Sequence, residues 1–215
     1  MAVFEPVLRL LFPARCLCCG AVVPLGREVC RDCQRRYSHF PPPGEWLGHP
    51  VVSVWLYREA YPLSLRRLKF RGDRGEGRRV AALMARQWRR QFPDAGEDLF
   101  TFMPMPPERE RRRGGNQAEL LARWIGEELG RPVLPLFWRE GVLTQHQLPG
   151  SARRQSGRTF HLLPEAEGLV AGKRVVLVDD LITTGATAGA CLRLLDEAGA
   201  EWTAMLAAAR AAPRS

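Results

Sequence analysis

The chain alternates between short runs rich in β-branched and aromatic residues and longer segments whose apolar positions recur every three or four residues. The short runs predict strands at 51–57, 99–103, 133–138, 173–178 and 202–208. The longer segments predict helices at 63–70, 77–92, 116–129 and 185–198. Strands that alternate with helices indicate an α/β fold, with a mainly parallel sheet flanked by helices on both faces.

The first 40 residues differ in composition from the rest of the chain. They hold five of the six cysteines and are followed by three consecutive prolines, which predict a stiff connection. We therefore divide the chain into a small cysteine-rich subdomain at 1–40, a Pro-rich linker at 41–50 and an α/β domain at 51–215.

The cysteines of the first part have the spacing of a metal site. Two Cys-x2-Cys pairs lie ten residues apart: Cys16 with Cys19, and Cys30 with Cys33. Four thiolates complete the tetrahedral shell of a structural zinc ion and leave no open position for catalysis. Cys18 is an alternative to Cys19 as a ligand, and disulfides or unligated thiols are the alternatives to zinc. The prediction is a small N-terminal zinc-binding subdomain.

Charge and hydropathy limit the kind of protein this is. The net charge of +9 favours anionic partners, either phosphorylated small molecules or nucleic acid. No apolar run approaches the roughly 18 residues that span a bilayer. The N-terminal segment carries Glu5, Pro6 and Arg9 and lacks a basic start, so it does not read as a signal peptide. We expect a cytoplasmic protein that does not insert into membranes.

The segment from Lys173 to Thr187 predicts a phosphate-binding turn. Its apolar strand brings Asp179 and Asp180 to the carboxyl edge of the sheet, where open α/β folds bind ligands. The following residues turn into a helix whose first amides can bind an anion. Two carboxylates beside a phosphate suit the hydroxyls of a ribose, so the expected ligand is a ribose 5-phosphate. The residues expected at the phosphate are Thr183, Thr184, Gly185, Ala186 and Thr187.

A strand that ends in two aspartates also begins the receiver domains of two-component signalling. Those domains need a phospho-accepting aspartate about two strands later. Here the only later aspartate is Asp196, which falls inside a predicted helix. We therefore reject the receiver interpretation.

A second turn, at 104–117, follows the predicted strand at 99–103 and is rich in arginine. If the two strands are parallel, this turn lies at the same sheet edge as the phosphate turn. Its guanidinium groups then suit a pyrophosphate, which they can bind in bidentate fashion. The alternatives are a solvated charged loop and, for the asparagine, a helix N-cap. The candidate pyrophosphate residues are Pro106, Arg109, Arg113 and Asn116.

In their order along the chain, these features resemble the ComF family, whose members are phosphoribosyltransferase-like proteins linked to natural DNA uptake (competence) in bacteria. The acidic pair followed by Thr-Thr-Gly-Ala-Thr is similar to the PRPP-binding signature of type I phosphoribosyltransferases. The double Cys-x2-Cys and the Pro-x-Pro turn before Arg-Gly-Gly-Asn-Gln complete the likeness. The resemblance extends from Cys16 to about Ala209.

The resemblance implies a fold and a set of roles. It implies a type I phosphoribosyltransferase-like domain in which Asp179 and Asp180 are the central catalytic residues and bind the ribose hydroxyls. It implies that the threonine turn binds the 5′-phosphate of PRPP. It also implies Mg²⁺ held mainly by the pyrophosphate and ribose oxygens of the ligand. The reaction that the resemblance implies is displacement of pyrophosphate from C1 by a nitrogen nucleophile of an unknown acceptor.

Two parts of the chain depart from the family pattern. The family's Arg-Gly-Phe-Asn-Gln has Gly115 in place of the phenylalanine, which should loosen the turn. A Thr-x-x-Gln then Arg-x-Asn stretch, in a segment expected to be irregular, is only partly kept, as Thr144, Gln147, Arg154 and Gln155.

Two functions remain open at this point. The first is an enzyme that transfers phosphoribosyl from PRPP. The second is a non-catalytic module that binds a nucleotide or single-stranded DNA and acts with a competence helicase. Tryptophans near arginines, such as Trp46, Trp55 and Trp88 with Arg89 and Arg90, are either base-stacking platforms or core residues.

Overall fold

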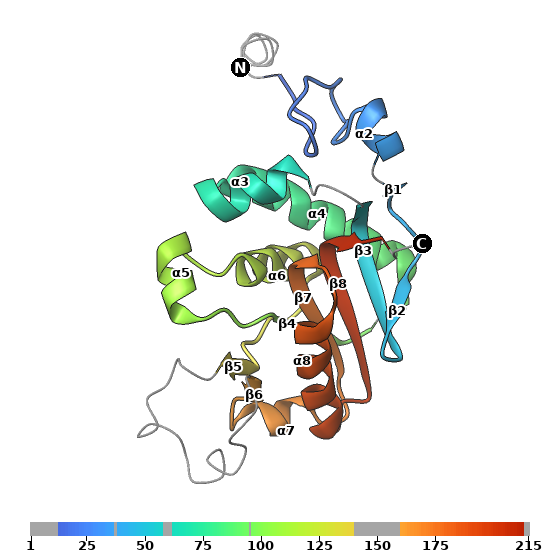
Figure 1. Ribbon diagram of the computed structural model, residues 1–215. Helices are drawn as coiled ribbons and strands as arrows, with labels where there is room; N and C mark the ends of the chain where they lie inside the picture. Colours follow the sequence, from blue (N-terminus) through green and yellow to red (C-terminus); the bar gives the residue numbers. More distant parts are fainter. Residues whose placement is uncertain (1–12, 37, 58–61, 95, 140–159, 213–215) are drawn as a thin grey trace, which may run out of the picture.

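A sheet of mainly parallel strands forms the centre of the molecule (Figure 1). The computed structural model describes residues 13–36, 38–57, 62–94, 96–139 and 160–212. The parallel strands lie in the order β3 (His49–Tyr57), β8 (Trp202–Ala211), β7 (Arg174–Ile182) and β4 (Asp98–Phe102). The predicted α/β fold with a mainly parallel sheet is confirmed.

Helices cover both faces of this sheet because its strands are apolar on both sides. Along β7, Val176 and Val178 pack toward one face, while Val175 and Leu177 pack toward the other. The first face carries α3 (Leu63–Arg71), α4 (Arg74–Gln91) and α6 (Gln117–Leu129), and the second carries α7 (Ala166–Val170) and α8 (Ala186–Glu197). Figure 1 shows α8 on the opposite side of the sheet from α4 and α6.

The predicted helices are present, with small shifts at their ends. Helix α4 begins three residues earlier than predicted because Asp73 caps it, accepting a hydrogen bond of 3.0 Å from the amide of Glu76. Helix α6 ends at Gly130, which adopts the left-handed conformation that commonly ends helices. The described residues contain no helix long and apolar enough to cross a bilayer.

The prediction of one strand at 133–138 is wrong. Val133 makes only an isolated bridge to Phe100, and the following strand, β5 (Phe137–Arg139), pairs with β6 (Phe160–Leu162) in a separate antiparallel sheet. Pro132 and Pro135 lack amide donors and so prevent a continuous ladder.

The segment at 41–50 is more than a linker. Within it, β2 (Gly44–Trp46) pairs with β3 in an antiparallel hairpin, and β1 (Ser38–His39) also pairs with β3. Strand β3 is the last parallel strand on its side of the sheet, and its outer groups are satisfied by this preceding chain.

The cysteine-rich part, which includes α2 (Arg31–Arg36), packs on α3 and α4 (Figure 1). Leu17 is fully buried in the same hydrophobic cluster as Leu65, Leu68 and Val80. The first 40 residues therefore share a core with the α/β domain.

Candidate functional site

A cavity of about 340 Å³ opens at the carboxyl ends of β4 and β7. Because these two strands are parallel neighbours, the turns that follow them meet at one edge of the sheet, as predicted. The two aspartates and the candidate residues of both turns line this cavity, namely Pro106, Arg109, Arg113, Asn116, Asp179, Asp180, Thr183, Thr184, Gly185, Ala186 and Thr187.

The two aspartates lie on the strand itself and not in a loop. The strand was expected to end at Val178, but β7 continues to Ile182 because Asp179, Leu181 and Ile182 keep their pairing with β8. The amide of Asp180 donates a hydrogen bond of 2.8 Å to Oδ1 of Asp179. A pleated strand holds this carboxylate pair more rigidly than a loop would.

The pKa of Asp179 is shifted strongly. Burial raises this pKa well above its ordinary value, and the negative charge of Asp180 raises it further. The amide hydrogen bond from Asp180 and the positive charge of Lys69 act in the opposite direction. A carboxylate that is costly to ionise is suited to a ligand that brings hydroxyl donors or a cation to it.

The phosphate turn joins β7 to α8 through Gly185. This glycine has φ +70° and stands at the N-cap of α8, and it is buried. Helix α8 has no side-chain cap at its start, and the first turn of the helix carries no acidic residue. The first amides of a helix have no partner within it, so those of Ala186, Thr187 and Ala188, which line the cavity, are available to an anion.

The arginine-rich turn contains a short helix that the sequence did not predict. Helix α5 (Pro107–Arg113) starts with a proline, whose fixed φ suits a first helical position, and ends at Gly114 in the left-handed conformation. None of its side chains is buried. Arg109 and Arg113 line the cavity, whereas Arg111 and Arg112 do not.

Asn116 lines the cavity but uses its side chain within the protein. Its Oδ1 accepts a hydrogen bond of 3.0 Å from the amide of Ala118, and its Nδ2 donates one of 2.9 Å to the carbonyl of Met103. The N-cap alternative therefore describes this residue. Gly115, beside it, has φ +135°, a conformation in which a phenylalanine would be strained.

Two further cations of the cavity were missed from the sequence. Lys69 comes from α3 and Arg139 from β5, so both reach the cavity from elements far from either motif. The guanidinium of Arg139 lies 5.0 Å from the ring centroid of Phe160. No local pattern marks these residues, because only the packing of α3 and of the small β5–β6 sheet brings them to the site.

The tryptophans that were either base-stacking platforms or core residues differ in their burial. Trp55 and Trp88 are buried in the core, and Trp88 Nε1 donates a hydrogen bond of 3.0 Å to Asp98. Trp46 is 38% exposed and packs beside Gly185. The candidate residues Thr144, Gln147, Arg154 and Gln155 lie outside the described residues.

The four predicted zinc ligands converge. The Sγ atoms of Cys16, Cys19, Cys30 and Cys33 all lie within 4.8 Å of one another. The Cys19 and Cys30 sulfurs are 3.8 Å apart. A tetrahedral zinc ion with Zn–S bonds of about 2.3 Å needs sulfurs about 3.8 Å apart, so the group fits zinc.

The remaining chemistry of the cluster agrees with that assignment. No disulfide joins any of the six cysteines, so the disulfide alternative is not the one observed. Burial acts to raise the pKa of Cys16, but hydrogen bonds from backbone amides, of which that from Cys30 is the strongest, lower this pKa to about 7. The lowered pKa favours the thiolate that zinc needs. Cys18 stands outside the group, and burial raises the pKa of its thiol far above the ordinary value. Cys191 is buried in α8 as a core residue, as expected.

Comparison with known proteins matches both parts of the chain. Residues 7–51 match the double zinc ribbon domain, and residues 120–214 match the phosphoribosyl transferase domain. Together with the parallel sheet and the four-cysteine group, these matches define a type I phosphoribosyltransferase-like protein with an N-terminal zinc ribbon.

Relatives narrow the class further. The chain is 27% identical to competence protein F of Haemophilus influenzae, over 93% of this chain and 98% of that protein. It is 30% identical to competence protein ComFC of Bacillus subtilis, over 84% of this chain and 73% of that protein. It is also 30% identical to DNA utilization protein YhgH of Salmonella typhimurium, over 86% of this chain and 85% of that protein. The chain belongs to the ComF family.

Proposed function

We propose that this protein binds Mg²⁺-PRPP, or a closely related ribose 5-phosphate, in the cavity and transfers the phosphoribosyl group to an acceptor nucleophile. The observation that carries the proposal is the arrangement of one cavity. An open helix N-terminus, a carboxylate pair and a group of cations all line it. These three features match the 5′-phosphate, the ribose diol and the pyrophosphate of one ligand.

Each part of the ligand has its own set of residues in this proposal. The amides at the start of α8 and the hydroxyls of Thr183, Thr184 and Thr187 bind the 5′-phosphate. Asp179 and Asp180 accept hydrogen bonds from the ribose hydroxyls.

The pyrophosphate is bound from several sides. Arg109 and Arg113 reach it from α5, Lys69 from α3 and Arg139 from β5. Guanidinium groups are suited to bidentate contacts with phosphate oxygens, and the ammonium group of Lys69 acts as a point charge. Asn116, in turn, supports the ligand indirectly by fixing the start of α6.

The chemistry that this arrangement supports is nucleophilic substitution at C1 of the ribose. The C1–O bond to pyrophosphate breaks, the bonding electrons leave with pyrophosphate, and a nucleophile forms the new bond to C1. The cations of the cavity stabilise the charge that develops on the leaving group, and the carboxylates face the positive charge on the sugar. Asp179 and Asp180 would lie beside a Mg²⁺ ion that the ligand's own oxygens bring to the cavity, and such an ion would supply positive charge to the diphosphate.

The names of the relatives support a role in handling DNA during natural transformation. We propose that this protein serves competence, in keeping with the relatives named competence protein F and ComFC, and that it acts in the cytoplasm.

A thermal-shift titration with Mg²⁺-PRPP tests the ligand assignment. Ligand bound to the native state adds about 2.7 kcal/mol of stability at a hundredfold excess over Kd. We expect the melting temperature of the wild type to rise by several degrees, and that of Asp179→Asn/Asp180→Asn not to respond. If millimolar Mg²⁺-PRPP leaves the wild type unchanged, the PRPP assignment is wrong.

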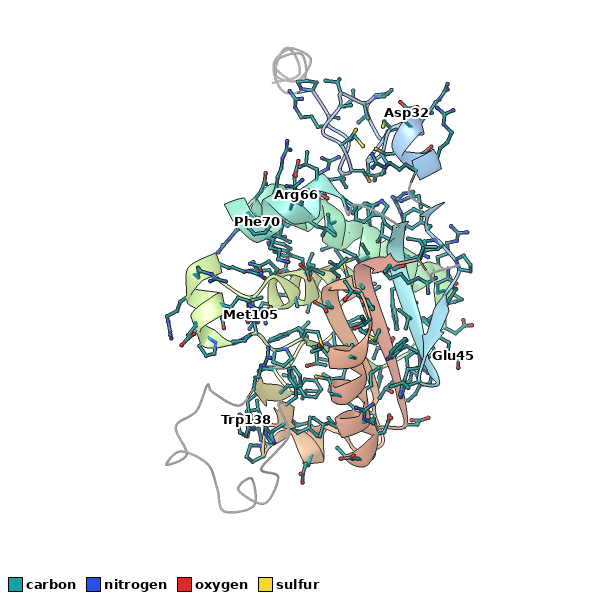
Figure 2. The ribbon with its side chains drawn as sticks, in the orientation of Figure 1. Asp32, Glu45, Arg66, Phe70, Met105 and Trp138 are labelled. Atoms are coloured by element: carbon teal, nitrogen blue, oxygen red, sulfur yellow. The ribbon has the colours of Figure 1, made fainter. Side chains whose placement is uncertain are left out.

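One observation favours the second candidate function, a non-catalytic module for single-stranded DNA that acts with a helicase. Phe70 is 69% exposed and projects with Arg66 from α3, next to Lys69 of the cavity (Figure 2). An exposed ring among cations suits base stacking. If oligonucleotide binding depends steeply on salt, is lost in Phe70→Ala and is indifferent to PRPP, this function replaces the first.

A further inference from the structure

Helix α3 begins without a cap of its own. Pro62 stands at the N-cap position, no side chain accepts a hydrogen bond there, and the first turn contains no acidic residue. A helix leaves its first amides without partners inside the helix, and buried amides without partners are costly. Ser64, in this first turn, is fully buried, so water does not serve this part of the helix.

The first zinc knuckle, residues 16–19, supplies the missing cap. The amide of Leu63 donates a hydrogen bond of 2.9 Å to the carbonyl of Cys18, and the amide of Ser64 donates one of 2.8 Å to the carbonyl of Leu17. Both acceptors lie between the zinc ligands Cys16 and Cys19. The geometry that directs the two thiols to the metal therefore also directs these carbonyls to α3.

Side-chain packing joins the same two elements. Leu17 is fully buried and shares a core cluster with Leu65 and Leu68 of α3. Gly20, just after the knuckle, has φ +80°, and a Cβ there would lie 3.2 Å from Cδ2 of Leu63. The knuckle thus covers the start of α3 as well as capping it.

The other end of α3 reaches the ligand cavity. Lys69 lies six residues beyond Leu63, which corresponds to about 9 Å along a helix axis. It lines the cavity and is half-buried there. Among the described residues, the other cations that line the cavity are Arg109, Arg113 and Arg139, which come from α5 and β5. Lys69 therefore links the cavity directly to the helix that the knuckle holds.

We propose that the zinc knuckle is a positioning element of the ligand site: by capping and covering α3 it holds Lys69 against the bound ligand. Zinc loss then weakens ligand binding through Lys69, although the four cysteines lie outside the cavity. The effect on affinity rests on the proposed function, whereas the capping itself does not.

Hydrogen exchange of the full-length protein without ligand tests the capping. Cys19 is the exposed member of the zinc group, so Cys19→Ser removes a ligand with little change in the core. In protein shown by metal analysis to have lost zinc, we expect the amides of Leu63 and Ser64 to exchange at least tenfold faster, with β7 unchanged. Unchanged exchange at both amides would overturn the proposal.

A double-mutant cycle on Mg²⁺-PRPP affinity tests the route through Lys69. The four proteins are the wild type, Cys19→Ser, Lys69→Ala and the double variant. We expect Cys19→Ser to weaken binding about tenfold, which is about 1.4 kcal/mol. The double variant should bind no more weakly than Lys69→Ala alone. Additive losses, or no loss in Cys19→Ser, would overturn the route through Lys69.

Two further measurements distinguish a failure of the capping from a failure of the proposed function. Zinc withdrawn from the wild type by a chelator should reproduce the exchange and affinity changes of Cys19→Ser, and a native far-ultraviolet circular dichroism spectrum shows that the sheet remains folded. If zinc-loaded wild type does not bind Mg²⁺-PRPP at all, the proposed function fails. The exchange of Leu63 and Ser64 still decides the capping in that case.

Discussion

Trp46 lies directly against Gly185, so closely that a Cβ atom on the glycine would be 2.7 Å from Cε2 of the indole. One turn later in α8, a Cβ on Gly189 would lie 2.8 Å from Cδ1 of Leu47. Two glycines four residues apart thus give α8 a flat side for the tip of the β2–β3 hairpin. Leu47 holds φ +52°, where Asn, Asp or Gly is usual in such turns. The hairpin supports the phosphate turn from outside the cavity.

The contact between Trp46 and Gly185 predicts that a methyl group added at residue 185 destabilises the protein. Gly185→Ala should lose about 1–3 kcal/mol of unfolding free energy, because the residue needs positive φ and has no room beside Trp46. Denaturant unfolding measures the loss. Gly130→Ala is the control, since Gly130 has φ +64° but no neighbour within 4 Å. Trp46→Ala should restore part of the stability of Gly185→Ala, and equal losses at the two glycines would contradict the steric argument.

Arginines of α5 should differ in their effect on pyrophosphate binding. Arg109→Ala removes a guanidinium from the cavity, whereas Arg112→Ala removes one from the same helix outside it. We expect the first variant to bind Mg²⁺-PRPP about tenfold more weakly, which is about 1.4 kcal/mol, and to bind ribose 5-phosphate as the wild type does. Isothermal titration of both ligands checks this. If Arg112→Ala weakens PRPP binding equally, the effect is one of net charge.

The raised pKa of Asp179 predicts a pH dependence of stability. The unfolded chain releases this proton near pH 4, but the folded protein retains it to higher pH because of burial and the charge of Asp180. The stability that Asp179 contributes is therefore complete below about pH 4 and is lost as pH rises through the raised pKa. Relative to Asp179→Asn, the ligand-free wild type should lose unfolding free energy as pH rises through this window. A difference that is constant with pH would exclude the shift.

Removal of the Asn116 cap should affect both stability and binding. Asn116→Ala loses the hydrogen bonds to Ala118 and Met103, and loss of an N-cap costs about 0.5–2 kcal/mol. Because these bonds join the start of α6 to the end of β4, we also expect weaker binding of Mg²⁺-PRPP at temperatures where the variant is folded. Titration beside denaturant unfolding separates the two effects. Unchanged affinity with the expected stability loss would make Asn116 purely structural.

Much of the molecule could be predicted from local patterns in the sequence. Apolar residues on one face of 77–92 predicted α4, and alternating strands and helices predicted a parallel sheet, because hydrophobic periodicity and right-handed crossovers leave few other arrangements. The same patterns failed at 133–138, where Pro132 and Pro135 interrupt the ladder. They also gave no sign that β7 continues through the two aspartates, since its pairing with β8 decides where it ends.

The features of the candidate site also separate into those set by local motifs and those set by tertiary packing. The sequence by itself determined the turn between β7 and α8 and the two Cys-x2-Cys pairs, because each is a short motif whose residues act together through local backbone geometry. Only the tertiary structure decided that Lys69 and Arg139 join the cavity, that Cys19 and not Cys18 completes the zinc group, and that Trp46 supports Gly185. These relationships connect residues through packing, and packing depends on the positions of whole helices and strands, which no local spacing encodes.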